Sequence, residues 1–277
     1  MNSMEGMEHF EMPKQEQEAD RLLDKQCAAP EEWIRRQEIK EAILETAEAS
    51  EARRLKGSNE VVYIKFKDGG EGVFKPEEGE DPDFRDMVPV HEFYKRERAS
   101  FIVDKFLGLE LIPTTVIREI GGRVGSVQEF VPSAKSGLEM NDSEREALAA
   151  EFYKLGVLDF IIWNADRGRY NYLATGDKVH AIDNSLSFKK NIMTVPESKF
   201  LTNRKAPDEL VQHLDAFSSW DEGHVLLKKE LLELISEEEA DACINRIGFI
   251  SRRLRIHGEL DEKTLNAILD NELYNPQ

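Results

Sequence analysis

Three polar side chains near the middle of the chain could together support phosphoryl transfer. Asp166 is followed five residues later by Asn171, and Asp183 lies twelve residues further on. In this chemistry a carboxylate faces the attacking hydroxyl, while an amide oxygen and a second carboxylate hold Mg²⁺ on the ATP phosphates. The spacing therefore predicts Asp166 as the catalytic carboxylate, with Asn171 and Asp183 as metal ligands.

The segments around these residues predict a rigid support. Residues 158–162, 170–173 and 179–182 are typical of a buried helix end and two short strands. The polar residues would then lie on a loop between ordered elements, where catalytic groups usually lie. An ordinary polar turn is the alternative interpretation, because Asp, Arg, Gly and Asn are common turn residues. The short pattern alone leaves both open.

A candidate nucleotide-binding hairpin lies upstream. Residues 61–76 alternate apolar and polar side chains, which predicts two strands joined by a glycine-containing turn. Gly69 and Gly70 would let the backbone approach phosphate groups. Lys75, at the end of the second strand, could reach the same phosphates as a point charge. For Lys75 taken alone, an exposed hairpin lysine is the alternative.

A helix that could position this lysine is predicted over residues 95–113. Apolar side chains recur there at helical spacing, and a glycine and a proline mark the end. Glu97, in the first turns, would face the hairpin and orient Lys75, as a helix glutamate does in kinases. A solvated Glu97, with Glu92 as the rival partner of the lysine, is the alternative.

Two further strands are predicted over residues 114–132, with a tight glycine turn between them. The second strand leads into a polar linker through Gln128, Glu129, Phe130 and Val131. In a kinase, a strand that leaves into the linker between the lobes offers backbone groups to adenine. On composition alone, the same residues could form an ordinary hairpin.

The order of these parts resembles the phosphoinositide 3/4-kinase superfamily, most closely its type II phosphatidylinositol 4-kinases. An Asp-Arg-Gly-x-x-Asn loop followed by Ala-Ile-Asp-Asn is distinctive of that branch, whereas related families typically carry His in place of Gly168. The matching runs occur in the family's order and are residues 72–76, 97–115, 125–131, 164–173 and 181–188.

The resemblance implies an α+β, bilobal protein-kinase-like fold with a small β-rich N-lobe and a larger helical C-lobe. It implies an enzyme, an ATP- and Mg²⁺-dependent kinase that transfers the γ-phosphate to a hydroxyl of phosphatidylinositol or of a protein. Lys75 would bind the ATP phosphates with support from Glu97, and residues 128–131 would form the adenine hinge. Asp166 would accept or orient the substrate hydroxyl. The implied metal ligands are Asn171 and Asp183.

The chain divides into three predicted regions. Residues 1–55 form an N-terminal extension that is partly disordered and then helical, residues 56–132 form the N-lobe, and residues 133–277 form the C-lobe. Residues 189–207, which have a basic bias, would form an activation or substrate-selecting loop.

The C-lobe is predicted to be mainly helical. A long helix is expected within residues 141–166, with Asp142 or Ser143 as its cap. Ser236 and Glu239 form a capping-box pattern at the start of a later helix. The further helices are predicted over residues 207–218, 221–234 and 237–255 and around residues 260–269.

Composition and charge restrict the partners and the setting. The 277 residues carry 55 acidic and 37 basic side chains, a net charge of −18, which disfavours nucleic acid and anionic lipid surfaces. No apolar run reaches the length of about 18 residues that a membrane span needs, so membrane contact would be peripheral at most. Two cysteines and no signal-like N-terminus predict a cytoplasmic, reducing setting.

One departure from the resembled family leaves the acceptor open. Type II lipid kinases carry a cysteine-rich, palmitoylated segment, whereas this chain has only Cys27 and Cys243, far apart. A soluble protein or a small molecule is therefore an alternative substrate to a phosphoinositide lipid. Two different functions also stay open, namely a pseudokinase or nucleotide-binding scaffold, and transfer of AMP to a protein by the same cradle.

Overall fold

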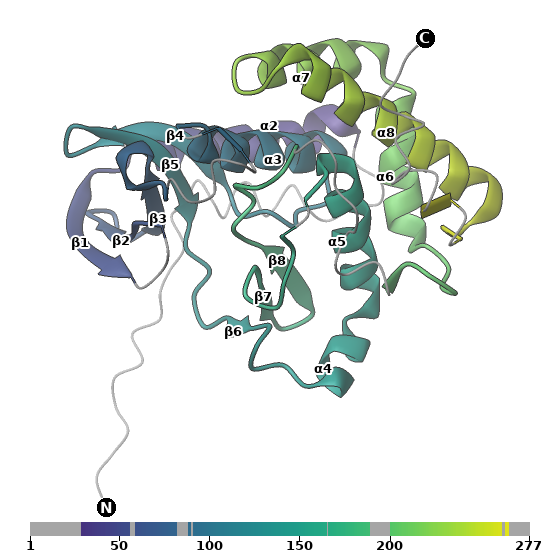
Figure 1. Ribbon diagram of the computed structural model, residues 1–277, viewed down its shortest axis with the longest axis horizontal. Coiled ribbons are helices and arrows are strands. Elements are labelled where there is room, and N and C mark those ends of the chain that lie inside the picture. Colours follow the sequence, from purple (N-terminus) through teal and green to yellow (C-terminus); the bar gives the residue numbers. More distant parts are fainter. Residues whose placement is uncertain are drawn as a thin grey trace, which may run out of the picture.

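The computed structural model of the chain describes most of the segments that carry the candidate residues (Figure 1). The predicted disorder of the N-terminal segment, most of the proposed substrate-selecting loop and most of the last predicted helix lie outside the described residues. The described residues are 29–55, 59–81, 88–89, 91–164, 166–188, 200–261 and 264–265.

A five-stranded antiparallel sheet forms the N-terminal region, in the order β1-β2-β3-β5-β4. The two predicted hairpins are confirmed, with Tyr63 opposite Val73 in one and Ile117 opposite Ser126 in the other. The strands are β1 (Ala49–Leu55), β2 (Val61–Phe66), β3 (Glu71–Pro76), β4 (Thr115–Ile120) and β5 (Arg123–Glu129). A 3₁₀ turn, η1 (Glu77–Gly79), follows β3.

The alternation of side chains in β2 and β3 separates the two faces of the sheet. Ile64, Phe66 and Phe74 are buried in a small apolar core that also contains Leu44 of helix α2 (Pro30–Thr46). Lys75 follows Phe74 directly, so its side chain lies on the opposite face of the strand. The core packing of β3 therefore directs the lysine away from α2.

Helix α3 (Phe93–Leu107) runs between the sheet and the C-terminal helices (Figure 1). It contacts α2, β4 and β5 as well as helices of the C-terminal region, and most of its side chains are buried. The helix ends earlier than the predicted residue 113. Gly108 takes a left-handed conformation, with φ of 63°, and closes the helix at that point.

The C-terminal region is mainly helical, with a small sheet in the order β6-β7-β8. Helix α5 is its centre, because nearly every residue from Phe152 to Ile162 is buried in the main apolar core. The helices are α4 (Asp142–Ala147), α5 (Ala149–Ile162), α6 (Asp208–Ser218), α7 (Asp221–Leu232) and α8 (Glu237–His257). The strands are β6 (Lys135–Ser136), β7 (Tyr172–Thr175) and β8 (Lys178–Ala181).

Two details of the helix prediction differ from the structure. The single helix expected within residues 141–166 is divided at Leu148 into α4 and α5, and Asn141, rather than Asp142 or Ser143, caps α4. The Asn141 side chain accepts the Glu144 amide in a capping box. The capping box predicted for Ser236 is confirmed at the start of α8. None of the described helices is long and apolar enough to cross a membrane.

Candidate active site

Lys75, Glu97 and Asp183 come together from three distant segments, β3, α3 and the residues after β8. The Lys75 ammonium forms an ion pair with Glu97 and lies 3.0 Å from Asp183 Oδ1. Glu97 is 2% exposed, Lys75 20% and Asp183 44%, so the cluster reaches solvent on the Asp183 side. The rival Glu92 pairs instead with Arg96, at 3.2 Å.

The charges of this cluster stabilise one another. Burial lowers the pKa of the Lys75 ammonium, but Asp183 and Glu97 raise it by more, so the net shift is upward. Lys75 in turn holds the pKa of Asp183 below its usual range. Burial raises the pKa of Glu97, and Lys75 opposes that shift. At neutral pH the cluster therefore presents a fixed ammonium beside an ionised carboxylate.

Asp166 and Asn171 form the second part of the site. Asn171 Nδ2 donates to Asp166 Oδ2 at 3.0 Å and to the Asp166 carbonyl at 2.6 Å. Burial raises the pKa of the Asp166 carboxyl, and the nearby Asp183 raises it further, whereas the bond from Asn171 lowers it. This burial is partial, because Asp166 as a whole is exposed. It is thus an accessible carboxylate, made more basic by its surroundings and held by one amide.

Two side-chain oxygens of the site that accept no hydrogen bond from the described residues could coordinate a magnesium ion. Asp183 Oδ2 and Asn171 Oδ1 have no partner among the described residues, and both are the hard oxygen ligands that Mg²⁺ prefers. The described residues contain no group of three or more His, Cys, Asp or Glu side chains that could hold a metal alone. The ion would therefore take its remaining ligands from phosphate and water, as is usual for Mg²⁺.

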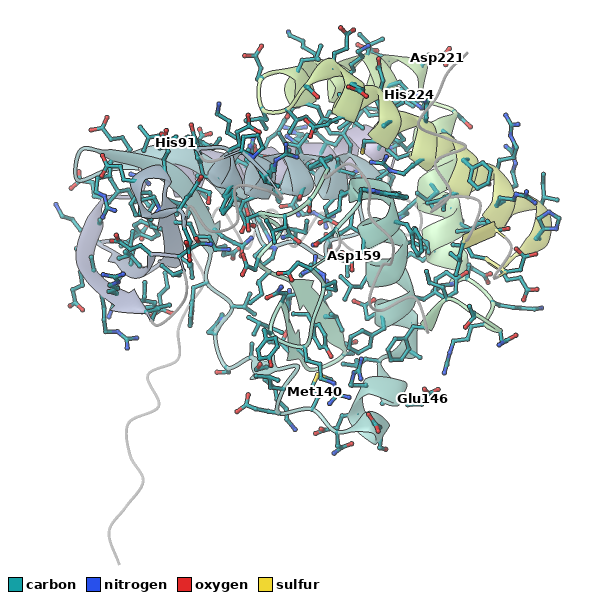
Figure 2. All side chains as sticks on the ribbon, viewed as in Figure 1. His91, Met140, Glu146, Asp159, Asp221 and His224 are labelled. Atoms are coloured by element: carbon teal, nitrogen blue, oxygen red, sulfur yellow. The ribbon has the colours of Figure 1, made fainter. Side chains whose placement is uncertain are left out.

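A fully buried arginine, which the sequence analysis did not select, holds the segments that carry Asn171 and Asp183. Arg167 pairs with Asp159 of α5 at 3.0 Å, with both side chains 0% exposed, and donates to the Ile182 carbonyl at 2.7 Å. It also donates to the Asn171 carbonyl and the Asn184 side chain. Asp159 lies in the interior of the molecule (Figure 2). The sequence signal was an acid in the apolar run of α5, because a buried charge needs a partner.

The end of β5 is the segment predicted to form the adenine hinge. The Glu129 amide donates to the Thr114 carbonyl at 2.8 Å, and the Phe130 amide donates to the Glu71 carbonyl at 3.0 Å. Within the described chain, the Glu129 carbonyl and the Val131 amide have no backbone partner. This segment thus has one free acceptor and one free donor, the pair of groups an adenine edge needs.

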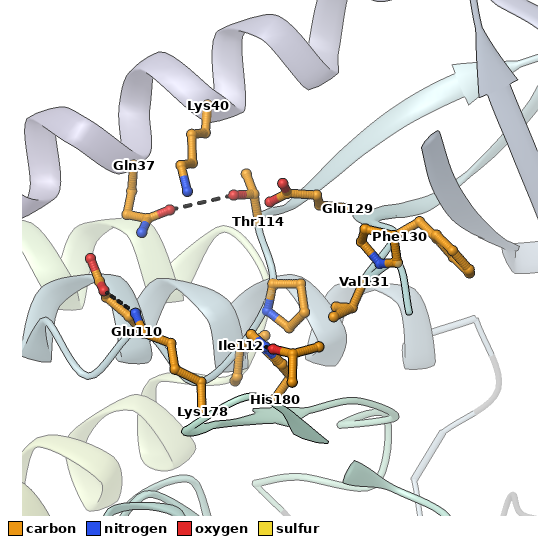
Figure 3. Close-up of a pocket in the computed structure, with 13 residues that line it drawn as sticks. Gln37, Lys40, Glu110, Ile112, Thr114, Glu129, Phe130, Val131, Lys178 and His180 are labelled. Atoms are coloured by element: carbon orange, nitrogen blue, oxygen red, sulfur yellow. Dashed lines mark hydrogen bonds and ion pairs between the residues drawn. The ribbon is translucent and has the colours of Figure 1, made fainter. Parts of the chain in front are cut away.

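The side chains of this segment make structural contacts within the sheet and line a cavity. Gln128 is buried and donates to Thr115 Oγ1 at 2.9 Å, so its amide holds β4 and β5 together. Phe130 packs edge-on against Tyr63 of β2 at 5.3 Å between ring centroids. A cavity of about 350 Å³ borders the segment between α2 and the β7–β8 hairpin (Figure 3). Its wall includes Lys40, Glu129 and His180.

The glycines of the β2–β3 turn are used within the turn. The Gly69 amide donates to the Phe66 carbonyl at 3.2 Å, and the Gly70 amide donates to Asp68 Oδ1 at 3.0 Å. Gly69 has φ of 93°, which explains the residue type at this position. Neither amide is left free, so the predicted phosphate contacts of Gly69 and Gly70 have no unpaired donor in this conformation.

Comparisons with known proteins locate the fold. No protein-family model and no curated protein matches the chain. Among solved structures, it is similar to the Golgi casein kinase with Mn/ADP bound, at 14% identity and a TM-score of 0.53, covering 79% of this chain and 75% of that one. A second structure of the Golgi casein kinase aligns over 85% and 75% at 14% identity, with a TM-score of 0.52.

A third similarity, to the Helicobacter pylori proinflammatory kinase CtkA, has a TM-score of 0.40 at 12% identity over 82% of this chain and 97% of that one, and it carries no argument. The first two show the fold alone, because their identities are low. The chain has a kinase-like α+β fold, with a β-sheet region before a mainly helical region. The predicted fold class is confirmed.

Proposed function

We propose that the chain is a kinase that transfers the γ-phosphate of Mg·ATP to an alcohol hydroxyl. The observation that carries the proposal is the contact of Lys75 with both Glu97 and Asp183, which joins three distant segments around one ammonium. Lys105 also lies between two carboxylates, Glu41 and Glu230, so the pairing alone is not distinctive. Lys75 differs because its partner Asp183 reaches solvent and lies near a second acid, Asp166. A lysine between two carboxylates, with Asp166 and Asn171 close by, is the arrangement that phosphoryl transfer uses.

Each residue then has a separate task. Lys75 would neutralise the α- and β-phosphates, and Glu97 would keep its ammonium in place. Asn171 Oδ1 and Asp183 Oδ2 would hold Mg²⁺, which supplies charge neutralisation on the β- and γ-phosphates when bound. The Glu129 carbonyl and the Val131 amide would bind the adenine edge.

The reaction itself is a direct displacement at phosphorus. The acceptor oxygen forms a bond to the γ-phosphorus while the bond to the β,γ-bridging oxygen breaks, and ADP leaves. Asp166 accepts the proton of the acceptor hydroxyl. Its raised pKa makes it a better proton acceptor than an ordinary aspartate. Positioning and charge neutralisation then supply most of the rate.

The similarity to a solved kinase with Mn/ADP bound supports nucleotide and divalent-metal use. The sequence resemblance to phosphoinositide 3/4-kinases supports that branch, with a phosphoinositide lipid or a protein as the acceptor. Neither source of support selects between these two acceptors.

The test is a transfer assay with γ-labelled ATP and Mg²⁺. One reaction contains phosphatidylinositol vesicles and the other a protein mixture, with Lys75→Met and Asp183→Asn as inactive controls. Label in lipid identifies a lipid kinase, and label in protein identifies a protein kinase. Label that enters protein only from α-labelled ATP would show AMP transfer instead. No transfer above the two variants in any reaction would contradict the proposal.

A further inference from the structure

The loop that follows Asp183 is held at both ends by two adjacent charged residues of α3. Glu97 accepts the Asn184 amide at 2.9 Å, and Arg96 donates to the Ser187 carbonyl at 2.8 Å. Consecutive helix residues point about 100° apart, so one turn of α3 can reach both ends of the loop. We call residues 184–187 the metal loop, because Asp183 immediately precedes it.

Asp183 needs such support because of its backbone. Its φ is 56°, in the left-handed region, which non-glycine residues adopt uncommonly although Asp does so more often than most. A residue in this region keeps its conformation only when its surroundings fix it. The direction of the Asp183 carboxylate therefore depends on the contacts that hold the metal loop against α3.

Arg96 extends this support to the start of α8. Its Nη2 donates to Glu239 at 2.8 Å and to Glu92 at 3.2 Å, and its side chain is only 4% exposed. The other oxygen of Glu239 accepts the Ser236 amide at 3.0 Å and the Ser236 hydroxyl at 2.9 Å, which completes the cap of α8. A continuous path of polar contacts, buried from Glu239 onward but exposed at Ser236, thus runs from the α8 N-terminus to the metal loop.

We propose that Arg96 is a positioning residue for the metal site, and that Glu239 at the α8 N-terminus fixes Arg96. The inference rests on the proposed function, because it assigns a role toward Mg²⁺ bound at Asp183. Arg96 itself touches neither nucleotide nor metal in this account. It keeps the Ser187 end of the metal loop in place, while Glu97 keeps the Asn184 end.

The first test is Arg96→Met, which keeps much of the side-chain length but loses the bonds. Mg²⁺ is titrated into protein mixed with a fluorescent ATP analogue, so that the reading is nucleotide binding and not turnover. Loss of a group that hydrogen-bonds directly to a metal ligand typically weakens metal affinity about 10- to 100-fold. Arg96 acts one step further away, through the Ser187 carbonyl, so we expect the Mg²⁺ midpoint to rise by about 10-fold at most, with metal-free nucleotide binding unchanged.

Arg98→Met is the matched control. Arg98 lies on the same helix, is 14% exposed, and bonds to Glu41 at 2.6 Å and to the Thr115 carbonyl at 2.5 Å, away from the metal loop. Its loss should lower stability in a similar way but leave the Mg²⁺ midpoint where it is in the unaltered protein. A purely structural role for Arg96 would make the two variants behave alike.

Two milder variants keep the inference testable if Arg96→Met does not fold. Glu239→Gln retains a cap acceptor but removes the charge that faces Arg96, and Arg96→Lys retains the charge but not the forked geometry. Both should raise the Mg²⁺ midpoint less than Arg96→Met. Unchanged midpoints in every variant that folds would overturn the inference and leave the proposed function standing. Absence of Mg²⁺-dependent nucleotide binding in the unaltered protein would overturn both.

Discussion

Two ion clusters near Asp183 use similar residues in different ways: the front cluster is Lys75, Glu97 and Asp183, and the rear cluster is Arg167 and Asp159. In the front cluster, Lys75 is 20% exposed and Asp183 44% exposed. In the rear cluster, Arg167 and Asp159 are both 0% exposed. The front cluster retains an unpaired carboxylate oxygen, whereas Arg167 also bonds to two backbone carbonyls and to Asn184. The front cluster can therefore exchange a hydrogen-bond partner, whereas the rear cluster has its partners fixed.

The difference follows from desolvation. Breaking a fully buried ion pair leaves a charge that water cannot reach, so such a pair resists rearrangement. A cluster with solvent access can lose one contact and replace it with a phosphate or a metal ion at low cost. The rear cluster therefore acts as scaffold for the loops that carry Asn171 and Asp183, and the front cluster is the one that we propose binds the nucleotide.

The largest effect on folding should come from Arg167→Met. This change leaves Asp159 buried without its facing cation and removes the bonds to both loops, so we expect unfolding free energy to fall by about 3–5 kcal/mol. Urea unfolding measures it. The double variant Arg167→Met, Asp159→Leu removes the stranded charge and should recover part of the loss. A loss below about 1 kcal/mol in the single variant, as for an exposed pair, would remove the distinction between the clusters.

Lys75→Met should affect the transfer rate strongly and stability weakly, unlike Arg167→Met. Loss of the ammonium that faces the phosphates should lower the transfer rate by about 10²–10³-fold. Stability should fall less than in Arg167→Met, because Glu97 keeps its bond from the Asn184 amide and can take up a proton. The labelled-ATP assay tests the expected loss of rate, and urea unfolding tests the expected loss of stability. An unfolding loss equal to that of Arg167→Met would show that both clusters are structural.

A third buried acid sharpens the comparison, because Asp104 has amide donors instead of a cation. It accepts the amides of Leu111 and Ile112, at 3.1 and 3.0 Å, and burial raises its pKa to about 7. The folded state thus keeps a proton that the unfolded chain loses near pH 4. Stability should fall as pH rises from about 4 to 7.

Asp104→Asn should remove that slope, since an amide oxygen can still accept from the loop. Comparison of urea midpoints for the variant and the unaltered protein at pH 5 and pH 8 checks the sign. The urea midpoint of the variant, relative to that of the unaltered protein, should be higher at pH 8 than at pH 5. A constant difference between the two pH values would show that Asp104 is ionised in the folded state.

The smallest expected effect is on thiol reactivity, and it tests the main apolar core, which contains Cys243. Cys243 of α8 is 0% exposed, and burial raises the pKa of its thiol to about 11. In a Cys27→Ser background, a thiol reagent at pH 8 should react with the native protein only at the rate of unfolding. Fast reaction in the absence of urea would show that solvent reaches this interior.

The parts of the fold that rest on local patterns could be predicted from the sequence. Alternation in residues 61–76 identified the hairpin that directs Lys75 away from the small core, and Ser236 with Glu239 identified the start of α8. The glycine at 108 indicated a helix end, but the prediction continued to residue 113. The break at Leu148 was missed, because both α4 and α5 fit one helical pattern.

The support of the site could not be predicted in the same way. Asp166, Asn171 and Asp183 were selected by type and spacing, but Arg167, in the same loop, was assigned no role of its own. Its partner Asp159 and its contact at Asn184 are non-local, and they become necessary only once α5 is buried. Arg96 was likewise indistinguishable from a solvated helix residue, because its partners Ser187 and Glu239 lie far along the chain.

Equilibrium binding of ATP with and without Mg²⁺ tests the central claim most directly, that Lys75 and the oxygens of Asn171 and Asp183 surround one magnesium nucleotide. The account predicts binding that Mg²⁺ strengthens, that Lys75→Met weakens in either condition, and that loses its Mg²⁺ dependence in Asp183→Asn. Absence of binding in the unaltered protein, or binding that neither substitution alters, would contradict it.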